Sequence, residues 1–134
     1  MTMQVLKVGI ISREDYIMRT KAIAKGEYRP KKDEPKVWFE SLKSMAEVLS
    51  NENQELLRLI LEKKPKSLTD LEVLSGRNKS NLSRTLKTLE RYGIVELERD
   101  NRKLIPKVHA INFSVEFGLT HRYFDKSRDR LACA

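Results

Sequence analysis

Side chains that can donate hydrogen bonds recur along NKSNLSRTLKTLERYG, residues 78–93. At about 100° per residue, with Leu82 at zero, these groups gather between about 140° and 200° around a helix, opposite the side that carries Leu82, Leu86 and Leu89. The polar set is Ser80, Arg84, Lys87 and Arg91. No acidic residue stands at its centre. Such a face can bind phosphate groups through Lys and Arg, and an Arg can donate two hydrogen bonds to one base edge.

The positive charge of the chain is concentrated around this segment. Residues 77–107 hold nine basic and four acidic residues, so they supply an excess of five out of the net charge of +8. Further candidate contacts are Arg77 and Lys79 at the start of the same helix, and Arg99, Arg102 and Lys103 after it. The alternative is an ordinary solvated surface, which is what most charged helix faces are. The local excess favours contact with nucleic acid.

Three further elements are expected to position these groups. A capping box of Ser67 with Asp70 begins a helix that presents leucines at helical spacing, and Gly76 ends it. A short turn leads to Asn78, a good N-cap for the helix over 78–92. The following VELERDNRKLIP alternates apolar and charged residues and predicts a β-hairpin over 95–106 with its turn at Asp100–Asn101. The order is therefore helix, turn, helix and hairpin.

The stretch from SLTDL through SNLSRTLKTLERYGIV resembles the MarR-like winged helix-turn-helix predicted transcriptional regulators, in particular a small prokaryotic group often encoded beside toxin-like partners. VWFESLKSMAEVLSNENQELLRLI at 37–60 is typical of the same group. The resemblance implies a recognition helix at 78–92 and a basic wing at 95–106. It assigns base-facing and phosphate-facing positions to Ser80, Asn81, Ser83, Arg84 and Lys87.

The expected fold class is α+β, a winged helix-turn-helix domain with an N-terminal strand-helix arm and a C-terminal strand. Residues 1–36 form the arm and a linker, 37–117 the domain, and 118–134 a basic tail. In the arm, Ser12 caps a helix whose apolar face includes Tyr16, Ile17 and Ile23. The strand at 110–117 alternates cleanly and needs a partner edge. The N-terminal strand can supply that edge, and we favour pairing between two subunits over pairing within one chain.

Composition limits the other classes of function. The chain of 134 residues, with a pI near 9.7, suits a small binder of polyanions. The single cysteine, Cys133, cannot form an internal disulfide, and no apolar run is long enough to span a bilayer. No signal peptide is recognisable at the N-terminus. We expect a cytoplasmic protein with no contact with membranes.

Nothing in the sequence predicts an enzyme, a cofactor or a metal. His109 and His121 are twelve residues apart, and no Cys or acidic residue lies at a metal-binding spacing from either. The glycines are too far apart in the sequence to form a phosphate-binding loop. The expected function is a sequence-specific DNA-binding transcriptional regulator, a repressor that binds double-stranded DNA as a homodimer on a palindromic operator. The resemblance adds an antitoxin-like autoregulator with a toxin-like protein partner. The alternative is a winged-helix module that binds protein or RNA without operator specificity.

Overall fold

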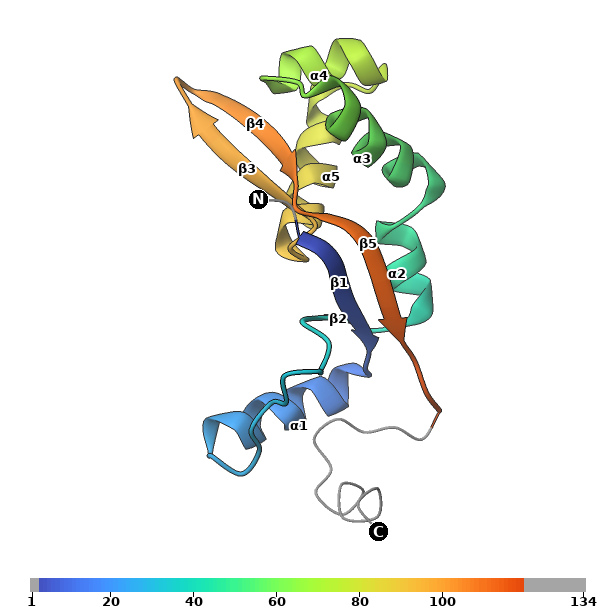
Figure 1. Ribbon diagram of the computed structural model, residues 1–134, viewed down its shortest axis with the longest axis vertical. Helices are drawn as coiled ribbons and strands as arrows, with labels where there is room; N and C mark the ends of the chain where they lie inside the picture. Colours follow the sequence, from blue (N-terminus) through green and yellow to red (C-terminus); the bar gives the residue numbers. More distant parts are fainter. Residues whose placement is uncertain (1–2, 120–134) are drawn as a thin grey trace.

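The expected α+β class is confirmed by the computed structural model, which describes residues 3–119 (Figure 1). The described chain contains five helices and five strands, arranged as a three-stranded and a two-stranded sheet. In chain order the helices are α1 (Arg13–Ala24), α2 (Leu42–Val48), α3 (Asn51–Lys63), α4 (Leu68–Ser75) and α5 (Lys79–Arg91).

Each helix begins at a side chain that replaces a missing main-chain partner. Ser12, Ser41, Ser50, Ser67 and Asn78 are the N-caps, and each accepts a hydrogen bond from the N–H three residues further on. The caps predicted at Ser12, Ser67 and Asn78 are confirmed. Asp70 also reaches back, although its carboxylate accepts from the N–H of Lys66 at 3.3 Å instead of that of Ser67.

The larger sheet has the order β2-β1-β5 and is parallel throughout. Its strands are β1 (Met3–Ile10), β2 (Val37–Phe39) and β5 (Ala110–Glu116). The second sheet is the antiparallel hairpin of β3 (Val95–Asp100) and β4 (Lys103–Val108). β5 follows β4 almost directly, so the hairpin leads into the parallel sheet (Figure 1).

The N-terminal strand pairs within its own chain, which corrects the expected pairing between subunits. Leu6 stands beside Phe113 and Val8 beside Val115 in the register of β1 with β5. Parallel neighbours need a long connection, and here all the elements from α1 to β4 supply it. Leu6 and Val8 are 3% and 1% exposed, so removing β1 would expose one side of the hydrophobic core to solvent.

A single hydrophobic core joins β1 to the segments that carry the candidate site. Leu82, Leu86 and Leu89 of α5 are each 0% exposed, as their spacing predicted. They pack in one cluster with Leu71 of α4 and Ile94, which precedes β3. Phe39 of β2 is also fully buried.

The apolar side predicted for the first helix is not buried. Tyr16 and Ile17 of α1 are exposed, and the one buried residue of this helix is Arg19. Its guanidinium binds the carboxylate of Glu34 at 3.0 Å and lies 5.0 Å from the centre of the Trp38 ring. Glu34 of the following loop and Trp38 of β2 thus hold the helix in place through Arg19, whereas Tyr16 and Ile17 face outward and Ile23 is half-buried.

Gly9 of β1 lies close against Trp38 and Pro35, the segment that holds α1 in place. A Cβ atom placed at Gly9 would lie 2.5 Å from the Trp38 ring and 2.8 Å from Pro35. We expect Gly9→Ala to lower the free energy of unfolding by about 1–3 kcal/mol, because the ring and the proline would have to move. Urea unfolding measures this loss. Val5→Ala, at a half-exposed position of the same strand, is the control; an equal loss in both variants would show that the Trp38 contact is unimportant.

Candidate nucleic-acid interface

The exposed side of α5 carries four of the predicted residues together. Ser80, Arg84, Lys87 and Arg91 are exposed, whereas the opposite side of the helix is fully buried. We call these four residues the α5 basic face. Within residues 3–119, the side chains of Arg84, Lys87 and Arg91 make no ion pair or hydrogen bond. Their donors are therefore available to a bound molecule.

The first turn of α5 is fixed by its cap and by α4. The Asn78 side-chain oxygen accepts hydrogen bonds from the N–H of Asn81 at 2.8 Å and from the Ser80 hydroxyl at 2.9 Å. The Lys79 N–H donates to the Glu72 carboxylate at 2.8 Å, and its ammonium donates to the Thr69 hydroxyl at 3.0 Å. Lys79 thus joins the two helices, unlike the cations of the α5 basic face.

Arg77 also has a partner within the chain. Its side chain is half-buried and donates to the Asn53 side-chain oxygen at 3.2 Å. The amide nitrogen of Asn53 in turn donates to the Val48 carbonyl at 2.9 Å. Arg77 therefore ties the turn before α5 to the start of α3. Of the remaining predicted helix residues, Asn81 and Ser83 are half-buried.

The three predicted hairpin cations all lie at the exposed tip. Arg99 is near the end of β3, Lys103 begins β4, and Arg102 lies in the turn between them. The turn residues are Asn101 and Arg102, with φ of 48° and 67°, one position later than predicted. Left-handed conformation at two central residues is what the tightest hairpin turns require, and asparagine tolerates it well.

Two of the three acidic residues of the hairpin, Glu96 and Glu98, lie close to basic partners. Glu98 lies 3.0 Å from the Lys107 ammonium, and Glu96 lies 3.4 Å from the His109 ring nitrogen. Both pairs are about half exposed, so they contribute little to stability. Lys107 is thus already paired, and the cations at the tip are the ones left to meet an external anion.

Several contacts that orient α5 were not predicted from the sequence. Glu72, Thr69 and Asn53 hold its N-terminal end through the bonds described above. At its C-terminal end, the Tyr92 ring stacks on Phe39 of β2 with 4.3 Å between ring centres. No local spacing signals these contacts, because each partner comes from a separate element.

Other kinds of site find little support in the described part of the chain. Residues 3–119 contain no group of three or more His, Cys, Asp or Glu side chains placed to hold a metal ion. None of the helices between these limits is long and apolar enough to cross a membrane. His121 and Cys133 lie outside the described residues.

Comparison with known proteins identifies a family for this chain. The comparisons found no match among curated proteins or solved structures. A family model, HVO_A0114, matches residues 48–114, which is half of the chain and runs from the last residue of α2 to Ser114 in β5. The match therefore contains the whole α5 basic face and the β3–β4 hairpin. The protein belongs to the HVO_A0114 family.

Proposed function

We propose that this protein is a sequence-specific DNA-binding transcriptional regulator that acts as a repressor. The observation that carries the proposal is the α5 basic face, whose three cations are exposed and have no partner among the described residues, on a helix whose other side is fully buried. Because the buried side of the helix is fixed by core contacts, the hydrogen-bond donors on its exposed side are held at fixed positions relative to a bound DNA.

The elements around α5 are compatible with a winged helix-turn-helix. α4 and α5 are joined by the short turn at 76–78, and the β3–β4 hairpin follows α5 after Tyr92–Ile94. A helix about 10–12 Å wide fits the major groove, which is about 12 Å wide. In this arrangement Arg84 reads a base edge, Lys87 and Arg91 bind phosphates, and the hairpin tip contacts the DNA backbone as the wing.

The proposed regulator works as a homodimer. One such unit reads few base pairs, and two copies about one DNA turn apart supply the remaining affinity on a palindromic operator. The resemblance to MarR-like regulators also suggests an antitoxin-like role, in which the protein binds a toxin-like partner and represses its own operon. No cofactor enters this mechanism.

RNA binding is the second candidate, and the composition of the α5 basic face argues against it. Single-stranded RNA is usually recognised by bases stacked on aromatic rings, and none of the four residues of this face is aromatic. Fluorescence anisotropy with duplex DNA, duplex RNA and single-stranded RNA of one sequence tests the choice. We expect the DNA duplex to bind most tightly; stronger binding of either RNA would favour the alternative.

The hairpin tip gives a separate prediction. Replacing both Arg102 and Lys103 with alanine should weaken binding to all duplexes similarly and lower the slope of log K against log salt by about 2, because two phosphate contacts are lost. Lys107→Ala is the matched control, since its ammonium already lies 3.0 Å from the Glu98 carboxylate. A loss restricted to one DNA sequence would instead mean that the tip reads bases.

A further inference from the structure

We propose that the outer edge of β5 pairs antiparallel with β5 of a second copy of the chain, around a two-fold axis at Ser114. This deepens the homodimer of the proposed function by naming its interface. The interface itself needs no DNA, so it is tested in the absence of DNA.

β5 differs from the other strand edges of the described chain. Exposed edges are commonly protected by shortness, by proline or by charged side chains. β2 is short, with three residues. β4 contains Pro106 and two lysines, and β3 ends in the charged residues ERD. β5 has seven residues, pairs on one side only with β1, and contains no proline, lysine or arginine. Its single charge is Glu116.

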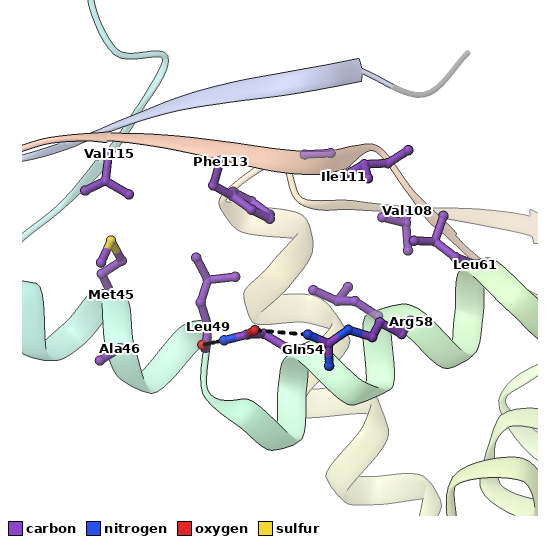
Figure 2. Close-up of a pocket in the computed structure, with 12 residues that line it drawn as sticks. Met45, Ala46, Leu49, Gln54, Arg58, Leu61, Val108, Ile111, Phe113 and Val115 are labelled. Carbon is purple, nitrogen blue, oxygen red and sulfur yellow. Dashed lines mark hydrogen bonds between the residues drawn. The ribbon is translucent and has the colours of Figure 1, made fainter.

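An apolar groove runs beneath this edge. Phe113 and Val115 extend from β5 towards α2 and α3, and Ile111 lies beside the start of the strand, near Val108 (Figure 2). Between strand and helices lies a groove of about 460 Å³, whose opposite wall includes Met45, Leu49 and Leu61. Ile111 and Val115 are 51% and 43% exposed, and Phe117, just beyond the strand, is 54% exposed. A contiguous apolar surface of this kind in a soluble chain marks an interaction site.

The sequence of β5 fits a second copy of itself. With Ser114 on the axis, Ile111 lies opposite Phe117 of the other copy, Phe113 opposite Val115, and Asn112 opposite Glu116. This pairing extends β5 by one residue to Phe117, so that all four apolar residues meet apolar residues and no like charges are opposed. A shift of the axis to Phe113 would leave Phe117 opposite His109. The pairing is isologous, as a two-fold dimer requires.

The charge distribution is also compatible with self-association. Two chains of net charge +8 repel one another, so a dimer must form away from the basic surfaces. Among the described residues that line the groove, Arg58 is the one that carries a charge, and it donates to the Gln54 side chain at 3.5 Å. β5 and the groove are therefore the near-neutral surface through which two copies can approach.

Sedimentation without DNA tests the register. We expect the wild-type chain to be dimeric, and Ile111→Lys or Phe117→Glu alone to weaken the dimer by at least about tenfold, which corresponds to about 1.4 kcal/mol. The double variant should regain dimerisation, because each lysine then faces a glutamate of the other copy. Within one chain these positions are about 20 Å apart and cannot pair. Val5→Lys, on the other face of the sheet, is the control and should remain dimeric.

Cross-linking provides the second readout. In a Cys133→Ser background, Ser114→Cys should form a disulfide-linked dimer under mild oxidation, because directly opposite residues of an antiparallel pair have Cα atoms about 4.5–5.5 Å apart, which is within the range that a disulfide spans. Asn112→Cys should not, because its two copies would be about 13 Å apart along the strands. A monomeric wild-type chain, a dimer that survives both single charge substitutions, or equal cross-linking at the two positions would overturn the proposal. A confirmed dimer that binds no DNA would leave it intact while removing the proposed function.

Discussion

Arg84→Ala is expected to weaken binding to the preferred duplex by about 5- to 150-fold, a loss of 1–3 kcal/mol. Arg84 is exposed on α5, between Leu82 and Leu86, which are both fully buried, so its main chain is held firmly. A guanidinium on such a support can donate two hydrogen bonds to one guanine, and alanine removes both. The loss should be accompanied by relaxed preference at one base position.

The measurement is fluorescence anisotropy of the variant against the preferred duplex and all its single-base changes. Lys87→Ala is the matched control on the same face, and its loss should be similar for every sequence, because a lysine that binds phosphate carries no sequence information. An Arg84→Ala profile that is parallel to the wild-type profile would mean that Arg84 binds phosphate as well.

Glu34→Ala is expected to cost about 3–5 kcal/mol, because it leaves a buried guanidinium without its carboxylate. The side chains of Arg19 and Glu34 are 10% and 7% exposed and lie 3.0 Å apart. Among residues 3–119, the Arg19 Nε and the Tyr28 hydroxyl already have no hydrogen-bond partner. Little else in this pocket can therefore compensate for the missing charge.

Urea unfolding, followed together with amide hydrogen exchange in α1, measures this loss. The control replaces both partners, as Arg19→Met with Glu34→Leu, since removal of a whole buried pair is often neutral or stabilising. We expect the double variant to be more stable than Glu34→Ala and to keep α1 protected. If the single variant is as stable as wild type, the ion pair does not hold α1 in place.

The features that could be predicted from the sequence are local ones. Ser67 and Asn78 cap helices through atoms three residues away, and the leucines of α5 face the core because of their spacing. The side chain buried in α1 could not be found in this way. Arg19 is buried by Glu34 and Trp38, which come from the following loop and strand, and helical periodicity contains no information about them.

The candidate site residues also fall into two groups: those whose environment follows from spacing within one helix, and those whose environment depends on packing between helices. Exposure of Arg84, Lys87 and Arg91 follows from the apolar side of their own helix. The bonds of Arg77 to Asn53 and of Lys79 to Thr69 depend on how α3 and α4 pack, and so does their role in orienting α5. The hairpin turn lies one residue later than predicted. DNRK contains no glycine, so the sequence does not fix the position of the turn.

Selection from a random pool of duplex DNA tests the proposed function most directly. The purified full chain should enrich one short motif repeated with two-fold symmetry, its half-sites centred about 10 base pairs apart. The Arg84→Ala protein, selected in parallel, should enrich a motif relaxed at one position of each half-site. Retention of DNA without enrichment of any motif would contradict a sequence-specific regulator and would leave only general binding of polyanions.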